Sequence, residues 1–172
     1  MKLPNVFLAV LAGLLSLTGC TKHEITSAPV GDPTEPTQAQ PRLSTLKVWL
    51  GPEELTAEIA LTPEQERTGM MFRTHMAEND AMLFALPYPQ RASFWMKNCP
   101  LPLSVAYIDP EGVIREIHPL NSFDTNPVVA ASENIRYALE TSQGWFDRHH
   151  IQPGVALRTE RGTLEETFQQ QR

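Results

Sequence analysis

Charged and amide side chains that could bind a ligand or take part in a reaction follow directly after apolar segments of this sequence. They are Arg73, Lys97, Asn98 and Glu140. Strand ends gather at the rims of a small closed sheet, and a charged group at the edge of the core needs a partner or water. We therefore expect these four side chains to lie near one another. Trp95 should border them as a flat apolar surface beside the Lys97 cation, which suits a carbohydrate or an anionic ligand.

Each of these residues also has a purely structural interpretation. Trp95 could pack under a loop while Lys97 is solvated. Arg73 could form a buried ion pair with Glu140, because a buried charge needs a partner. Lys97 could take the place of Arg73 in that pair, and the sequence leaves these alternatives open.

Cys99 and the methionines give weaker signals for catalysis or metal binding. A nucleophilic Cys99 with His118 as its base would need a lowered thiol pKa, and nothing in the sequence supplies one. Thioethers select copper, but the spacing of the methionines and of His75 suits irregular core packing better. These methionines are Met70, Met71, Met76, Met82 and Met96. The sequence therefore predicts no metal site and no cofactor.

The elements that must position these residues are short strands. Alternation of Leu46, Val48 and Leu50 predicts a strand, and Thr62-Pro63-Glu64-Gln65 predicts the capped start of a helix that ends near Gly69. Asp109-Pro110-Glu111-Gly112 predicts a type I turn between two strands. Further strands are expected at 55–61, 81–86, 92–96, 105–108, 113–117, 137–141 and 155–159, and a second short helix at 144–150. The predicted fold is α+β and mainly β, with seven or eight short strands in a barrel-like arrangement and two short helices.

The N-terminal segment predicts export and lipid anchoring. Lys2 precedes an apolar run from Val6 to Leu17, which is too short to span a bilayer, and Leu17-Thr18-Gly19-Cys20 resembles a lipobox. We expect residues 1–19 to be a signal peptide and Cys20 to carry the lipid. Thr21, rather than Asp, after the Cys indicates the periplasmic face of the outer membrane.

The remaining sequence divides by composition. Residues 20–44 carry four prolines among small polar residues and predict an extended tether, 45–161 should form the globular domain, and 162–172 should be a disordered tail. The formal net charge is -6, and it becomes -7 without Lys2. An acidic chain of this kind does not attract phosphate backbones, so we expect no nucleic-acid partner.

Four segments carry a resemblance to a known family. They are Gly69-Met70-Met71-Phe72-Arg73, Phe94-Trp95-Met96-Lys97-Asn98, Val105-Ala106-Tyr107-Ile108-Asp109 with Gly112, and Tyr137-Ala138-Leu139-Glu140 with Gly144-Trp145-Phe146. In order and spacing they resemble the prokaryotic family called domain of unknown function 192. The resemblance implies a compact, β-rich exported domain and no known activity. Cys99 stands where the family usually has Thr, and Ser104 where it often has Asp.

Three functional classes remain open. The leading one is a tethered binding module in the cell envelope, for a glycan or a partner protein, because no paired carboxylates, metal ligands or catalytic triad are evident at useful spacing. The second is a small enzyme acting on cell-wall or polysaccharide material, with Glu140, Lys97, Asn98 and Arg73 as candidate groups. The third is a purely structural protein, which would have no cleft.

Overall fold

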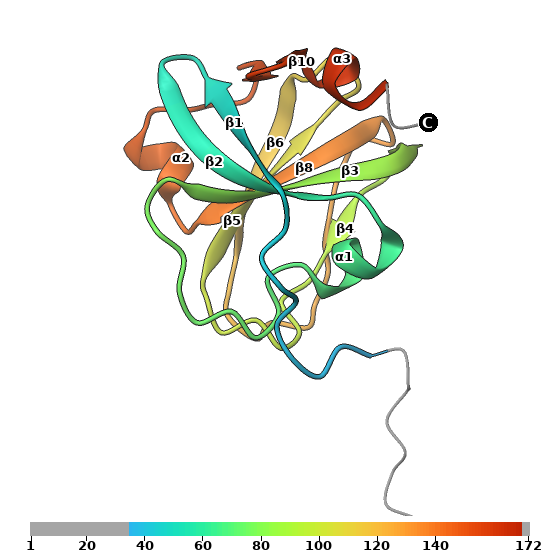
Figure 1. Ribbon diagram of the computed structural model, residues 1–172, viewed down its shortest axis with the longest axis vertical. Coiled ribbons are helices and arrows are strands. Elements are labelled where there is room, and N and C mark those ends of the chain that lie inside the picture. The colour runs from blue at the N-terminus through green and yellow to red at the C-terminus, as the bar shows by residue number, and fades with distance from the viewer. Residues whose placement is uncertain (1–34, 170–172) are drawn as a thin grey trace, which may run out of the picture. The chain divides into compact units, whose positions relative to one another are not determined.

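The computed structural model describes residues 35–169, which form a mainly β, α+β domain, as the sequence predicts (Figure 1). It has ten strands and three short helices, and three of the strands have only two residues. The strands are β1 (Thr45–Leu50), β2 (Glu53–Ala60), β3 (Asp80–Gln90), β4 (Ser93–Phe94), β5 (Leu103–Ile108), β6 (Ile114–Leu120), β7 (Val128–Val129), β8 (Ile135–Ser142), β9 (Leu157–Thr159) and β10 (Gly162–Thr163). The helices are α1 (Pro63–Thr68), α2 (Trp145–Arg148) and α3 (Leu164–Gln169).

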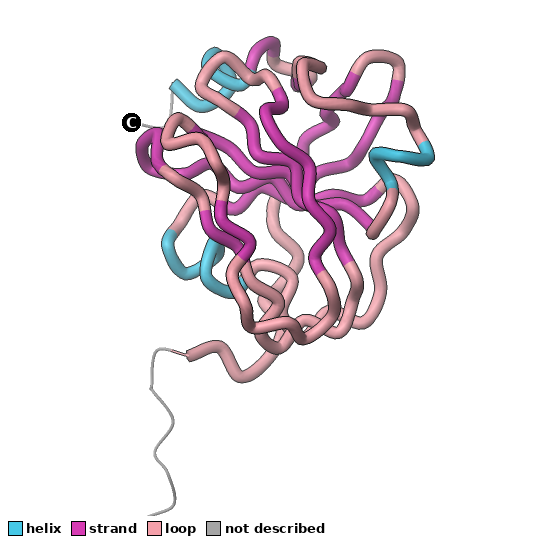
Figure 2. The backbone as a smooth tube through the Cα atoms, turned by 180° about the vertical axis from the view of Figure 1, so that it is seen from behind, coloured by secondary structure: helices cyan, strands magenta, loops and turns pink. Residues whose placement is uncertain are grey.

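Eight strands form one mixed sheet in the order β10-β9-β1-β2-β3-β8-β5-β6, and β4 pairs with β7 in a separate ribbon. The pair β2–β3 is parallel, and α1 lies in its connection, while the other pairs in the sheet are antiparallel. Within residues 35–169 the strands do not close into a barrel, although an isolated bridge joins Val113 to Ala156. The backbone trace shows the strands at the centre and the short helices at the periphery (Figure 2).

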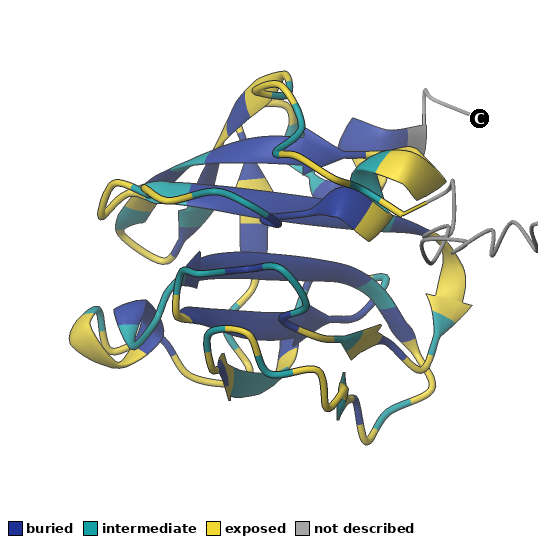
Figure 3. Ribbon diagram, turned by 90° about the horizontal axis from the view of Figure 1, so that it is seen from below, coloured by how far each residue is buried: buried dark blue, intermediate teal, exposed yellow. Residues whose placement is uncertain are grey.

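The sheet buries apolar side chains on both faces, and each face has its own core. Tyr137 and Leu139 of β8 point into a core that includes Trp145 of α2 and Phe168 of α3. Ala138, on the other face, packs in a second core with side chains from β3, β5 and the segments around β4. Buried residues are accordingly concentrated in the strands of the sheet (Figure 3). This second core is the one that contains the candidate site.

Two local signals are confirmed in atomic detail. Thr62 caps α1: its hydroxyl accepts a hydrogen bond from the Gln65 amide, and the Gln65 side chain accepts one from the Thr62 amide. The turn predicted at 109–112 joins β5 to β6, with the Gly112 amide donating to the Asp109 carbonyl at 3.0 Å. Gly112 has a φ of 85° there, a conformation that favours glycine.

Two expectations about the strands are wrong. The strand expected at 81–86 is longer: β3 continues through Pro87 and Pro89 to Gln90, with an irregularity between Ala85 and Gln90. Proline is tolerated where a strand leaves its regular ladder. The strand expected at 92–96 ends at Phe94, so Trp95 and Lys97 lie in a turn rather than on the outer face of a strand.

Both ends of the described chain are more ordered than expected. In the predicted tether, the Gln40 side chain donates to the backbone carbonyls of Gln65 and Gly69, and the Leu43 amide donates to Glu58 at 2.7 Å. Residues 162–169 of the predicted disordered tail form β10 and α3, and they bury Leu164 and Phe168. The domain therefore extends beyond 45–161 in both directions.

Other predictions fall on residues that the structure does not describe. The signal peptide at 1–19, Cys20 and the beginning of the tether lie outside the described residues. Between residues 35 and 169, no helix combines the length and the apolar character needed to cross a membrane.

Candidate functional site

Glu140 is the residue around which the candidate site is built. It lies in β8, opposite Met82 of β3 on one side and Val105 of β5 on the other. Because side chains alternate across a strand, Glu140 shares the face of Ala138 and points into the second core. A carboxyl group is thus placed in an otherwise apolar layer, at the centre of the sheet.

A cavity of about 390 Å³ opens over this carboxyl group. Its wall comes from α1 and the turn after it, β3, β4, the turn at 95–99, and Leu103 of β5. Most of the deep wall is apolar and consists of Met70, Phe84, Leu86, Phe94, Met96 and Leu103. A volume in this range suits a small-molecule ligand. The third functional class, a structural protein without a cleft, therefore loses support.

The Glu140 carboxyl group is buried and has no partner in the described part of the chain. The residue is 4% exposed, and no group within residues 35–169 donates a hydrogen bond to it or forms an ion pair with it. Burial removes water from the charged form and raises the pKa of Glu140 to about 8. At neutral pH the carboxyl group is mostly protonated, so it can donate one hydrogen bond and accept others.

Trp95 lies at the mouth of this cavity. The residue is 46% exposed, and the Lys97 ammonium lies 5.5 Å from the centre of its ring. The expected flat surface beside a cation is therefore present, although a turn rather than a strand supplies it. Glu66 of α1 also lines the cavity, and its partial burial raises the pKa of its carboxyl group.

Cys99 lines the same cavity but is not set up as a nucleophile. Burial, with the nearby Glu140 charge, raises the pKa of the Cys99 thiol to about 12, so the thiolate is absent at neutral pH. The thiol lies 3.6 Å from the Leu101 carbonyl, to which it donates. His118, the candidate base, contacts the Glu116 carboxylate at 3.0 Å instead. The interpretation of Cys99 as a packed small residue is the one that the geometry favours.

We expect Cys99→Thr to leave the fold and ligand binding almost unchanged. The threonine hydroxyl can donate to the same carbonyl, and the change in volume is small, so the free energy of unfolding should change by less than about 1.5 kcal/mol. A thermal melt and a binding titration measure the two effects. A variant that melts normally but has lost binding would assign the thiol a direct role.

Of the four polar side chains expected to cluster, only Glu140 lines the cavity, and Trp95, expected to border them, lines it too. In the described part of the chain Arg73, Lys97 and Asn98 are not among the residues that line it. The segments themselves do meet, because the Phe72 amide donates to the Asn98 carbonyl at 2.7 Å. Asn98 has a φ of 56°, so its backbone forms the sharp turn beside the cavity.

Arg73 is paired with a carboxylate that the sequence analysis did not single out. Its guanidinium donates to both oxygens of Glu58 in β2, at 2.8 and 2.9 Å, and Met82 separates Glu58 from Glu140 in the register. The proposed Arg73–Glu140 pair is therefore wrong, as is its alternative with Lys97, because Glu140 has no ion-pair partner in the described chain. Strand alternation was the available signal: it places Glu58 on the face opposite to Leu55, Ala57 and Ile59.

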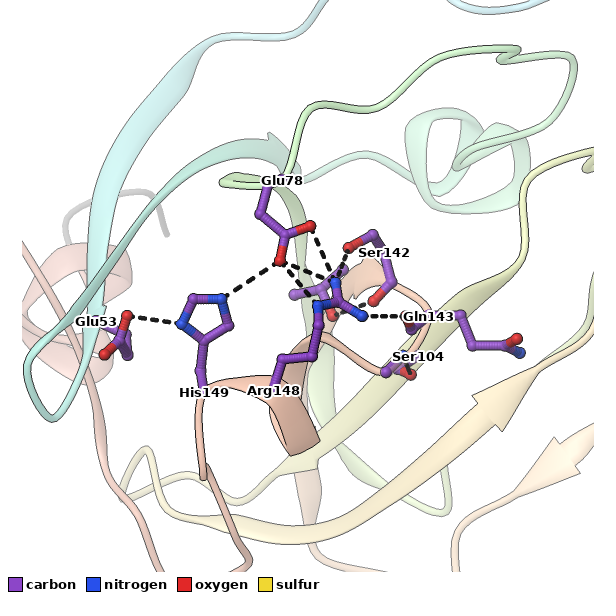
Figure 4. Close-up of polar contacts among 9 residues, drawn as sticks. Glu53, Glu78, Ser104, Ser142, Gln143, Arg148 and His149 are labelled. Carbon is purple, nitrogen blue, oxygen red and sulfur yellow. Dashed lines mark hydrogen bonds and ion pairs between the residues drawn. The ribbon is translucent and has the colours of Figure 1, made fainter.

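A second polar cluster lies around α2 (Figure 4). Arg148 donates to Glu78 at 2.9 and 3.1 Å, and this bond lowers the pKa of the Glu78 carboxyl group. His149 lies between Glu53, at 2.8 Å, and Glu78, at 3.4 Å, and its ring stacks on Trp145. These groups pair with one another and join α2 to the segment before β3 and to the start of β2. We interpret this cluster as structural.

Ser104 belongs to the neighbourhood of α2 and not to the cavity. Its neighbour Val105 faces Glu140 across β5 and β8, so Ser104 points to the opposite face of the sheet. The Ser104 hydroxyl accepts a hydrogen bond from the Gly144 amide at 3.0 Å, directly before α2. A carboxylate could accept the same bond, so the departure from Asp at this position does not affect the cavity.

The comparisons with known proteins match the fold but bring no activity. The model of the family DUF192, described as "Uncharacterized ACR", matches residues 47–159. A solved structure of a proposed transcription regulator from Sinorhizobium meliloti 1021 is 30% identical with a TM-score of 0.66, over 70% of this chain and 97% of that one. A protein of unknown function from Novosphingobium aromaticivorans DSM 12444 is 26% identical with a TM-score of 0.60, over 66% of this chain and 83% of that one. No curated protein sequence matches the chain.

Proposed function

The chain belongs to the DUF192 family of uncharacterised proteins, whose description assigns no activity, and we propose from its cavity that it is a small-molecule binding protein of the cell envelope. The observation that carries this proposal is the unpartnered Glu140 carboxyl group at the bottom of an apolar cavity of about 390 Å³. A buried polar group without a partner destabilises the fold, and a ligand group that binds to it offsets this. The ligand is then an apolar molecule with one polar group that reaches Glu140.

A glycan or a partner protein, the ligands that the sequence favours, would use the mouth of the cavity instead. Trp95 offers a face on which a sugar ring could stack, with Lys97 beside it. The deep wall, however, consists mainly of aliphatic, aromatic and thioether groups, which match few sugar hydroxyls. A small apolar ligand therefore fits the cavity better than an unmodified glycan does.

An enzyme remains the second candidate, because one observation favours it. A carboxyl group whose pKa is about 8 is well suited to act as a general acid near neutral pH. Hydrolysis also needs a group that activates water or attacks the substrate, and the neighbouring Cys99 thiol is protonated. Binding without reaction is therefore the first proposal.

A nucleic-acid ligand suits this chain poorly, although one of the similar structures is that of a proposed transcription regulator. A net charge of -6 repels the phosphate backbone, which supplies most of the affinity in non-specific DNA binding.

We expect the exposed cavity residue Ser93 to be a position where binding can be blocked without disturbing the core. Ser93→Trp should fill the opening, whereas the control Thr125→Trp adds the same bulk at an exposed site outside the cavity. The probe is phenethyl alcohol, a small ring with one hydroxyl group, and its contacts are mapped by NMR chemical-shift changes. Shifts should centre on the cavity in the wild type and the control and disappear in Ser93→Trp. Shifts that lie elsewhere, or that persist in Ser93→Trp, would contradict the proposal.

The envelope location is a separate part of the proposal and depends on Cys20. Cys20→Ser should release the protein from the membrane fraction, because two or more acyl chains would provide the stable anchor. Immunoblots of membrane and soluble fractions measure the distribution, and Cys99→Ser is the matched control that removes the other cysteine. Equal membrane association of Cys20→Ser and the wild type would refute lipid anchoring without affecting the cavity.

A further inference from the structure

The cavity combines a carboxyl group at its bottom with aromatic rings in its wall. Phe84 and Phe94 pack edge to face with their ring centres 5.0 Å apart, and Trp95 lies at the mouth. Aromatic faces attract cations through the ring quadrupole, and rings together with a carboxylate are a common way to bind an ammonium group. We infer that the natural ligand is a small organic cation, an ammonium group on an apolar body, with its nitrogen at Glu140. This inference rests on the proposed function, since it names the class of ligand for the same cavity.

A cationic ligand would supply the ion-pair partner that Glu140 lacks within the described residues. The carboxyl group has no cation or hydrogen-bond donor within the described residues, so its charged form is disfavoured until a positive group enters. A charge-assisted hydrogen bond is about twice as strong as a neutral one. An anionic ligand would instead bring a second negative group to the same position.

The other charged residues that line the cavity lie near its opening, and Glu140 is the acidic residue in its deep part. On α1, Glu66 and the exposed Arg67 lie next to each other in sequence, and before β4 Arg91 is paired with Glu133 at 3.0 Å. A cationic ligand would therefore pass both signs of charge at the opening and meet one acid inside.

Two further titratable groups face Glu140 from the elements packed around it, and neither becomes charged in the neutral range. Burial raises the pKa of the Cys99 thiol and of the Tyr107 hydroxyl, and the nearby Glu140 raises both further. On the β2 side, the Arg73–Glu58 pair is separated from Glu140 by Met82. A change in ligand affinity between about pH 6 and pH 8 that disappears in Glu140→Gln can thus be assigned to Glu140.

Binding of a cation should release a proton from Glu140. The ligand nitrogen stays protonated, as an ordinary alkylamine does, so the carboxyl group loses its proton when the ion pair forms. Only protein molecules in which Glu140 is ionised can form the ion pair with the ligand. The affinity for the cation should therefore rise about tenfold per pH unit up to about pH 8 and then level off. A neutral ligand of the same size should show no such dependence.

The test compares three probes that share a ring and a chain but differ in charge: phenethylamine, phenethyl alcohol and phenylacetate. Calorimetric titrations of the full chain, in buffers with different ionisation enthalpies, give the affinity and the number of protons released. We expect the amine to bind at least about tenfold more tightly than the alcohol at about pH 8, and phenylacetate to bind most weakly. Glu140→Gln should remove this preference and the proton release, whereas Glu111→Gln, an exposed carboxyl group outside the cavity, should keep both.

Failure of this inference can be told apart from failure of the proposed function. If the alcohol binds in the cavity and the amine binds no more tightly, or if Glu140→Gln retains the amine preference, the ligand is not a cation and the cavity proposal stands. If none of the three probes binds to the wild type, both the inference and the proposed function fail. Hydrolysis of an ester probe that depends on Glu140 would replace binding with the enzymatic alternative.

Discussion

Replacing Glu140 with glutamine should make the protein more stable at about pH 8, by about 4 kcal/mol, even though it removes a central buried residue. The amide has nearly the same size as the carboxyl group but carries no charge at any pH. In the wild type, the folded protein must either keep Glu140 protonated or bury an unpaired charge. Glutamine removes that penalty and leaves the packing against Met82 and Val105 in place.

The direction of the pH dependence follows from the raised pKa. In the unfolded chain the carboxyl group titrates near 4.5, and in the folded protein at about 8, so the folded state holds the proton more tightly. The contribution of Glu140 to stability is fully present below about pH 4.5 and is lost as the pH rises through about 8. The wild type and Glu140→Gln should therefore have similar stability in mild acid and diverge steadily as the pH increases.

Urea unfolding of both proteins at a series of pH values measures this divergence. Taking the difference between the two proteins cancels the other carboxyl groups, such as Glu78 and Glu116, whose lowered pKa values act in the opposite direction. Glu111→Gln, on the exposed turn between β5 and β6, should follow the wild-type curve. A constant difference between Glu140→Gln and the wild type across the range would mean that Glu140 already has a partner when the protein is folded.

Local signals in the sequence were sufficient to predict the elements that are formed by residues close together in the chain. The hairpin of β5 and β6 and the capped start of α1 are each specified by a few neighbouring residues, and both are confirmed. The same kind of signal was missed at the C-terminus. Thr163 and Glu166 bond to each other's backbone amides at 3.1 and 2.8 Å, a spacing that predicts a helix start. Composition alone predicts a disordered tail there, but the segment forms α3 and buries Phe168.

The candidate site was less predictable, because its parts meet through pairings that are distant in the sequence. Glu140 was identified from the apolar run before it, and Trp95 from its neighbour Lys97. They share a cavity because β4 ends at Phe94 and a turn follows it. The sequence analysis predicted a strand to Met96 and therefore did not predict this turn. Strand alternation places Glu58 on the face opposite to Leu55, but it does not indicate that Arg73 contacts Glu58. The partner of Arg73 is set by the parallel pairing of β2 with β3, which places Glu58 near the turn after α1.

Substitution of Arg73 should have the opposite effect on stability to substitution of Glu140. Arg73→Ala should destabilise the fold by about 3 kcal/mol, because it leaves the Glu58 carboxylate buried without its main cation. The Glu58 side chain is 9% exposed and the Arg73 side chain 17%, so solvent screens this pair only slightly. The Leu43 amide at 2.7 Å and the more distant Arg42 at 3.9 Å would still contact Glu58, so we expect a loss near the lower end for a broken buried pair.

Three variants separate the broken pair from ordinary truncation. Arg73→Ala should lower the melting temperature on the order of 10 °C, as measured by circular dichroism. The double variant Glu58→Leu with Arg73→Met should recover most of that loss, because two apolar side chains of similar volume leave no unpaired charge. Arg91→Ala, which breaks the exposed pair with Glu133, should cost at most about 1 kcal/mol. A loss for Arg73→Ala as small as that for Arg91→Ala would show that water reaches Glu58, and the guanidinium would then be available to a ligand after all.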